Sequence, residues 1–192
     1  MISKNPKKII LYLLRNLELS NINQISRKLD ISVGSAFKIL KSLEEKNIVL
    51  PSYLGNAKYY QINLKNEEAK KLCELILLEE KRTLKGYAKL YSDELQKFNE
   101  AETIILFGSV LANKDFNDVD VLFVANKPKE VVKFCLELSK IRTKPVVPLI
   151  LKKGDLIKEI RDKKEVILNI IKTGVILKGE SIFVEVIQNA NL

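Results

Sequence analysis

Histidine is absent from this sequence of 192 residues. Without it the chain has no Ser-His-Asp or Cys-His nucleophile pair, no HExxH metal site and no imidazole proton shuttle. Cysteine is also scarce: Cys73 and Cys135 lie far apart in apolar stretches. Their placement gives neither a zinc-binding spacing nor a disulfide framework. We therefore expect the protein to work in the reducing cytoplasm.

Long hydrophobic runs are missing as well. Residues 9–14 form an apolar run after a lysine-rich start, but the run is too short for a signal peptide and lacks a small-residue cleavage site. No other segment reaches the length of a membrane span, so we expect no membrane partner. With 46% hydrophobic and 30% charged residues, the composition is that of a soluble globular protein of one large or two small domains.

Positive charge is concentrated in the first third of the chain. The formal net charge is +9, and residues 1–65 carry eleven Lys or Arg against four Asp or Glu. Residues 66–100 are close to neutral, with seven basic and eight acidic side chains. A basic segment of this kind suits a polyanionic partner, so we expect nucleic acid to bind within residues 1–65.

Residues 1–65 have the pattern of three helices followed by a hairpin. A first apolar face precedes a short polar-led helix over residues 23–29, which Asn21 or Asn23 can cap. Ser32 can cap a third helix, and Gly55-Asn56 is a tight-turn signal between two strands. We expect the core face of the third helix to consist of Val33, Ala36, Phe37, Leu40 and Leu43.

This order resembles the winged helix-turn-helix domains of bacterial and archaeal repressors, and residues 23–49 carry the resemblance. It implies that the third helix enters the major groove of double-stranded DNA and that the wing flanks it. The DNA-facing residues would be Ser32, Ser35, Lys38, Lys41 and Ser42 on or next to the third helix, Arg27 and Lys28 on the second helix, and Lys58 on the wing. Winged helices also serve as protein-interaction modules or RNA binders, and these alternatives stay open.

Residues 66–100 are expected to form a long connecting helix, broken or bent near Gly86. They contain no proline, and apolar side chains recur at intervals of three and four. One interpretation is a helix that packs on the next domain. The other is a dimerisation helix that pairs two winged helices over a two-fold DNA site, which predicts a homodimer.

Residues 101–192 contain two apolar strands, and polar residues stand at their junction. Gly108-Ser109 ends the strand over residues 103–107, and Asp118 and Asp120 open the next strand. Alternation along a strand places both carboxylates on one face, with Cα atoms about 7 Å apart. Paired carboxylates are suitable ligands for Mg²⁺, and a Gly-Ser turn can present backbone N–H groups to a triphosphate.

This pattern resembles the minimal, stand-alone branch of the nucleotidyltransferase superfamily related to DNA polymerase β. Residues 151–179 resemble the closing helices and last strand of that branch. The resemblance implies a mixed sheet flanked by helices, Asp118 and Asp120 as catalytic metal ligands, and Gly108 and Ser109 as nucleotide-binding residues. Mg²⁺ and a nucleoside triphosphate would be the cofactor and substrate, with nucleotidyl transfer by two metal ions. Because the branch often acts as an antitoxin, a toxin-like partner protein is also implied.

The sequence departs from the family pattern in three places. Eight residues separate Ser109 from Asp118, about one fewer than usual, and the small residue normally found after Gly-Ser is missing. The family's third carboxylate normally lies on the next strand, here residues 145–151, which contains no Asp or Glu. Asp115, Asp155 and Glu159 lie outside that strand and would need an unusual geometry to replace it.

We therefore predict an α+β protein of two domains: a winged helix at 1–65, a connecting helix at 66–100 and a nucleotidyltransferase-like domain at 101–192. The predicted function is a DNA-binding transcriptional regulator whose C-terminal domain has lost transferase activity. The alternative is an active Mg²⁺-dependent enzyme that transfers a nucleoside monophosphate to a protein or a small molecule and also binds DNA.

Overall fold

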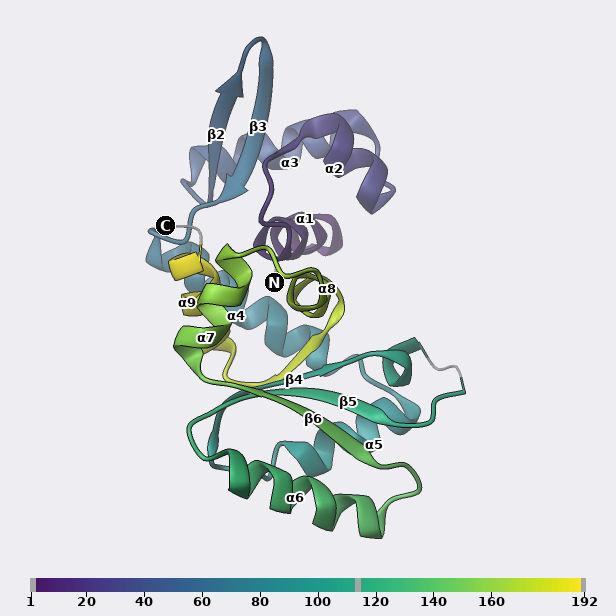
Figure 1. Cartoon of the computed structure of the whole chain (residues 1–192). Coiled ribbons are helices and arrows are strands. Elements are labelled where there is room, and N and C mark those ends of the chain that lie inside the picture. Colours follow the sequence, from purple (N-terminus) through teal and green to yellow (C-terminus); the bar gives the residue numbers. More distant parts are fainter. Residues whose placement is uncertain (1–2, 113–114, 191–192) are drawn as a thin grey trace. The chain divides into compact units, whose positions relative to one another are not determined.

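The computed structural model describes residues 3–112 and 115–190, and the chain forms two compact units, Met1–Ile76 and Leu77–Leu192. The boundary falls inside helix α4 (Glu67–Lys81), so the predicted connecting segment is divided between the units. Both units combine helices with a sheet, and the fold class is α+β as predicted. Figure 1 follows the elements along the chain.

Before α4, the first unit has three helices among its described residues and a small antiparallel sheet in the strand order β1-β3-β2. Its elements before α4 are α1 (Lys4–Arg15), β1 (Ser20–Asn21), α2 (Ile22–Leu29), α3 (Val33–Glu45), β2 (Val49–Leu54) and β3 (Ala57–Ile62). Gly55-Asn56 forms the turn between β2 and β3, which pair in register from Leu54 opposite Ala57 to Val49 opposite Ile62. This is the architecture of a winged helix-turn-helix, with β2 and β3 as the wing.

Side-chain caps fix the starts of α2 and α3. Asn21 accepts a hydrogen bond from the Gln24 backbone, and the Gln24 side chain accepts one from the Asn21 backbone, which completes a capping box. Asp30 ends α2 in the left-handed conformation, and Ser32 then caps α3 by accepting from the Ser35 backbone at 3.2 Å. These caps satisfy backbone donors that would otherwise lack partners at both helix starts.

The segment after the wing forms two helices instead of one. Helix α4 ends at Lys81, and α5 (Gly86–Leu95) begins after a short turn. Gly86 has a φ of 55°, a left-handed conformation that glycine adopts without steric cost. The predicted break near Gly86 is therefore confirmed, and it separates the segment into two independent helices.

The second unit is built on a four-stranded mixed sheet in the order β6-β5-β4-β7. Its remaining elements are β4 (Ala101–Phe107), the short helix η1 (Ser109–Ala112), β5 (Val119–Ala125), α6 (Pro128–Ile141), β6 (Val146–Leu151), α7 (Lys153–Arg161), α8 (Glu165–Thr173), β7 (Val175–Lys178) and α9 (Glu180–Ala190). Only the β5–β6 pair is parallel. Figure 1 shows α5 and α6 on one face of the sheet and α7 and α8 on the other.

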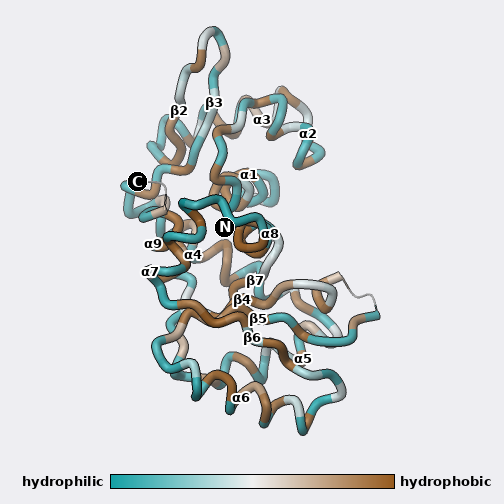
Figure 2. Tube along the Cα trace, viewed as in Figure 1, coloured by the Kyte–Doolittle hydropathy of each residue, from teal (hydrophilic) through white to brown (hydrophobic). Residues whose placement is uncertain are grey.

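Strands β4, β5 and β6 are hydrophobic along most of their length, as Figure 2 shows. Val119, Val121 and Phe123 of β5 pack in one cluster with buried side chains of α5 and α6. Because successive side chains alternate across a strand, Asp120 faces the opposite side of the sheet, toward α7 and α8. Within the described residues, no helix combines the length and hydrophobicity needed to span a membrane.

Candidate functional site

The exposed face of α3 carries both basic and apolar side chains. Ala36, Leu40 and Leu43 are buried, as expected. The prediction that Val33 and Phe37 also face the core is wrong: their exposed fractions are 48% and 54%. Each residue of a helix is turned about 100° from the last, so Phe37 lies at the edge of the face that Ala36 and Leu40 define. The prediction for Phe37 used only its hydrophobic type, which does not distinguish the centre of the core face from its edge.

The structure exposes most of the residues predicted to face DNA. Lys38, Lys41 and Ser42 are exposed on α3, as are Arg27 and Lys28 on α2. Among the described residues, neither Lys38 nor Lys41 forms an ion pair, so both ammonium groups are available to phosphates. Ser32 is committed to capping α3, and Ser35 is only half-exposed. The contacts of all these residues with DNA stay predictions.

Lys58 lies on the wing but is held by protein groups. Its Nζ donates to both carboxylate oxygens of Glu44 at 3.0 and 2.7 Å. It also lies 5.3 Å from the ring centre of Tyr60 and 5.8 Å from that of Tyr53. This hydrogen bond to the Glu44 carboxylate raises the pKa of Lys58 above its usual value. The pair ties the end of α3 to the wing, a role that sequence reasoning missed because Glu44 carries no distinguishing local signal.

The acidic site forms where β4 ends and β5 begins. Phe107 of β4, Asp120 of β5 and Val147 of β6 are register partners across three neighbouring strands. Asp118 immediately precedes β5, and Gly108-Ser109 immediately follows β4. Both carboxylates are half-buried, and Ser109 is exposed. The fold therefore brings together the four residues that the sequence analysis singled out.

Gly108 makes room for the Asp120 carboxylate. A Cβ atom on Gly108 would overlap Asp120 Oδ2 and would lie 3.2 Å from Cγ. The φ of Gly108 is 81°, which side chains other than glycine's rarely adopt. Glycine at this position therefore serves two purposes: it permits the turn after β4 and keeps the carboxylate at the edge of the turn.

Val147 occupies the position next to Asp120 on the third strand. As register partners in a parallel pair, Asp120 and Val147 share one face of the sheet, and the Val147 side chain is 45% exposed. The start of β6 is well anchored: Tyr91 donates its hydroxyl to the Lys144 carbonyl at 2.8 Å, and Ser139 Oγ accepts from the Val146 backbone at 2.9 Å. An apolar side chain thus lies beside Asp120 on the third strand.

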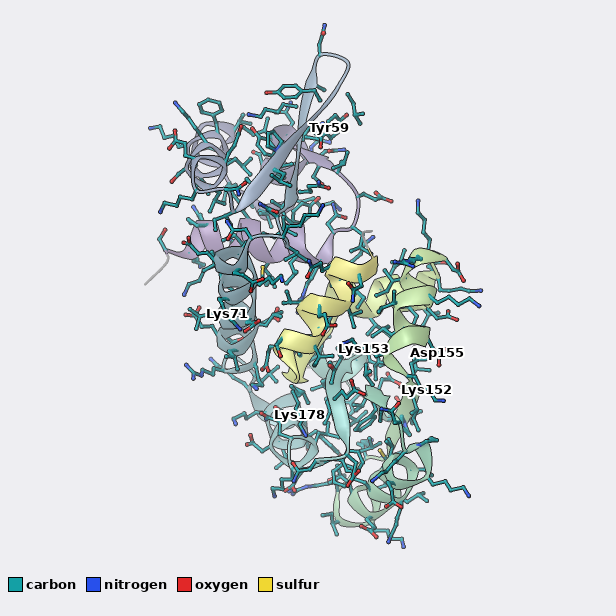
Figure 3. All side chains as sticks on the ribbon, turned by 90° about the vertical axis from the view of Figure 1, so that its left-hand side faces the viewer. Tyr59, Lys71, Lys152, Lys153, Asp155 and Lys178 are labelled. Atoms are coloured by element: carbon teal, nitrogen blue, oxygen red, sulfur yellow. The ribbon has the colours of Figure 1, made fainter. Side chains whose placement is uncertain are left out.

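The other acidic candidates are placed elsewhere. Asp155 and Glu159 belong to α7, which follows the far end of β6, and Figure 3 labels Asp155 at the start of that helix. Asp120 pairs with Val147 whereas Val124 pairs with Leu151, so four residues, or about 13 Å, separate the two ends. Asp115 lines a cavity of about 380 Å³ together with Tyr87 and Phe116. The remaining spacer residues 113 and 114 lie outside the described residues.

Asp120 carries an electrostatic cost in the protein without a bound cation. Burial raises its pKa above the usual value, and the nearby Asp118 charge raises it further. Ionisation of Asp120 is therefore less favourable in the folded state than in the unfolded state. The contribution of Asp120 to stability is therefore greatest at low pH and is lost as the pH rises through its folded-state pKa.

Asp120→Asn is expected to raise the melting temperature at pH 7 without Mg²⁺ by about 1 to 3 °C. The gain should disappear near pH 3, where the aspartate is protonated in both states. Thermal unfolding followed by circular dichroism across this pH range measures the effect. Asp115→Asn, which changes an exposed carboxylate, is the control. A lower melting temperature for Asp120→Asn at neutral pH would contradict the electrostatic interpretation.

The donor set fits one Mg²⁺–nucleotide complex. Asp118 and Asp120 supply hard anionic oxygens, and the phosphates of a nucleotide would supply further ones, as Mg²⁺ prefers. When bound, the ion would neutralise phosphate charge. The described residues contain no group of three or more acidic, cysteine or histidine side chains placed to hold a metal. They therefore do not fit a pair of ions held by three carboxylates.

The fold and the site together define a protein with a winged helix-turn-helix unit and a nucleotidyltransferase-like unit. Residues 89–182 match the family model described as "Polymerase beta, Nucleotidyltransferase". The match runs from α5 into α9 and includes Gly108, Ser109, Asp118 and Asp120. The C-terminal unit thus contains a nucleotidyltransferase-like domain, as its sequence predicted.

Other comparisons give only distant likenesses. No curated protein matches the sequence significantly. The adhesin competence repressor AdcR from Streptococcus pyogenes is 20% identical, with 51% of this chain and 69% of AdcR covered and a TM-score of 0.39. ZitR from Lactococcus lactis, in complex with DNA, is 18% identical, with 73% of this chain and 76% of ZitR covered and a TM-score of 0.37. These TM-scores are low; the elements α1 to β3 by themselves give the first unit its winged-helix architecture.

Proposed function

We propose that the chain is a DNA-binding transcriptional regulator whose C-terminal unit binds a nucleotide without transferring it. The observation that carries the first half is the exposed face of α3, where Lys38 and Lys41 stand free of ion pairs among the described residues. The second helix of a helix-turn-helix pair reads the major groove, and α3 occupies that position after the capped turn.

The phosphate contacts of this surface would dominate its affinity. Arg27, Lys28, Lys38 and Lys41 are the exposed cations of the helix-turn-helix. Each phosphate contact releases a condensed counterion, which contributes about −0.9 to the slope of log affinity against log salt. Four contacts give a slope between about −3 and −4, which is a loss of about 100-fold from 50 to 200 mM salt.

Fluorescence anisotropy with a labelled DNA duplex and a labelled RNA hairpin of equal length tests the proposal. The DNA should bind more tightly than the RNA with the slope given above, because the deep, narrow major groove of A-form RNA does not admit a helix. Tighter binding to the RNA hairpin would favour RNA binding. Binding to neither would leave the first unit as a protein-interaction module and would overturn the proposal.

The second half of the proposal rests on Val147. Asp118 and Asp120 offer anionic oxygens to a Mg²⁺–nucleotide, but the neighbouring position on β6 is apolar. In a transferase, a third carboxylate would help to hold the catalytic ion and to take the proton from the attacking hydroxyl. Neither function is available to a valine, and the chain has no histidine to replace it.

An active nucleotidyltransferase is the second candidate function. The overlap that a Cβ on Gly108 would make with Asp120 Oδ2 favours it, because this close approach keeps the turn and the carboxylate in a ligand-binding arrangement. The acceptor would be a toxin-like partner protein or a small molecule.

We also propose that the regulator binds a two-fold DNA site as a homodimer and that it works in the cytoplasm.

A further inference from the structure

The exposed apolar residues of α3 form a stripe beside the cations. Val33 and Phe37 lie one turn apart on the helix, and about half of each side chain is in solvent. Isolated apolar residues on a surface are common and need no explanation. Val33 and Phe37, by contrast, are neighbours on the exposed face of α3, and together they form a larger apolar surface than an isolated residue does.

The stripe faces the wing side of α3. Phe37 and Glu44 are seven residues apart and therefore lie along the same side of the helix. Glu44 binds Lys58 of β3, so this side of the helix adjoins the wing. Lys41, one turn after Phe37, lies between the stripe and the centre of the exposed face. Phe37 thus stands in the N-terminal half of α3, where recognition helices contact base edges.

We propose that Phe37 contacts the 5-methyl group of thymine in the major groove, and that the protein thereby prefers thymine at one position of its DNA site. This proposal rests on the proposed DNA binding and adds a base preference to it. The thymine methyl is the only apolar group on the base edges of the major groove, and phenylalanine is one of the side chains that contact it. Lys38 and Lys41, which lie next to Phe37 on the exposed face, would hold the helix against the neighbouring phosphates.

Charge favours DNA over a second copy of the chain as the occupant of this face. In a two-fold contact the same surface meets itself, so an α3–α3 interface would bring Lys38 and Lys41 of both copies together. Like charges at such a short distance oppose association. A duplex instead presents phosphates to the lysines and methyl groups to the phenylalanine.

Removal of the thymine methyl tests the contact directly. Wild-type binding to poly(dA-dT) duplex is compared with binding to poly(dA-dU) duplex, which differs by that methyl group alone. Burial of one methyl group is worth about fourfold in an equilibrium constant, so wild type should prefer poly(dA-dT) about three- to tenfold. Phe37→Ala should bind both duplexes with nearly equal affinity. Phe37→Leu, which keeps an apolar side chain, should retain part of the preference.

Leu136→Ala is the matched control, because Leu136 is also an exposed apolar residue, at 58%, but lies on α6. It should keep the full preference of wild type. Because about half of the Phe37 side chain is in solvent, both variants should remain folded at the temperature of the binding assay, which thermal unfolding checks. If Phe37→Ala retains the wild-type preference, the methyl contact is wrong while DNA binding stands; if wild type binds neither duplex, the proposed function itself fails.

Sedimentation velocity tests the remaining alternative, in which the stripe is an interface between two copies of the chain. Phe37→Ala should sediment as wild type does, because the proposal gives Phe37 no part in self-association. A dimer of wild type that dissociates in Phe37→Ala, together with equal wild-type binding to both duplexes, would show that the stripe is an interface between copies and would overturn the proposal.

Discussion

Replacing Lys38 and Lys41 together by alanine is expected to weaken binding to duplex DNA about 10- to 100-fold at low salt. It should also reduce the slope of log affinity against log salt by about 2, since each phosphate contact accounts for about one unit. The physical reason is that two counterions fewer are released when the variant binds. Anisotropy titrations at several salt concentrations give both quantities.

The matched control is Lys129→Ala with Lys133→Ala, which removes two exposed lysines from α6. This pair lowers the net charge by the same amount but lies in the second unit, so the slope should stay at its wild-type value. A slope that falls equally in both double variants would mean that total charge, and not the α3 surface, determines binding. An unchanged slope in Lys38→Ala with Lys41→Ala would remove α3 from the DNA interface.

The second large effect concerns the acidic site. Calorimetric titration of ATP or GTP with Mg²⁺ into the whole chain should show binding that depends on the metal. Asp118→Asn with Asp120→Asn should weaken it more than about 100-fold, because loss of outer partners of a metal site alone costs 10- to 100-fold. Asp155→Asn with Asp162→Asn, two exposed carboxylates at the bounds of α7, is the control and should bind as wild type does.

Two results would change the proposed function. Absence of binding in wild type would mean that the C-terminal unit is a scaffold that has lost its ligand as well as its activity. Transfer of labelled nucleotide to any acceptor by wild type, at a rate above that of Asp120→Asn, would show an active enzyme. The third carboxylate would then have to come from a partner or from a rearranged loop, since Val147 cannot serve.

Local signals predicted a large part of the fold. The caps at Asn21 and Ser32, the Gly55-Asn56 turn and the glycine break near residue 86 each act over a few residues, so sequence alone reveals them. The same holds for Gly108-Ser109 and the paired aspartates, whose spacing along one strand determines the face they share.

The same local signals could not predict how distant segments pair. The strand at residues 146–151 was predictable, but its register with β5 was not, and only the register places Val147 beside Asp120. The Lys58–Glu44 ion pair likewise joins residues fourteen positions apart on different elements. Phe37 shows a third limit, because hydrophobic type cannot tell a residue in the core from one at the edge of the core face that is half in solvent.

The two cysteines give the chain a built-in reporter of unfolding. Cys73 and Cys135 are free thiols in the interiors of different units, and burial raises the pKa of each to about 12. A buried, protonated thiol does not react with maleimides or iodoacetamide, which require an accessible thiolate. The native protein therefore leaves a cysteine introduced on the surface as its only labelling site, and the rate at which Cys73 and Cys135 are alkylated measures how often each unit opens.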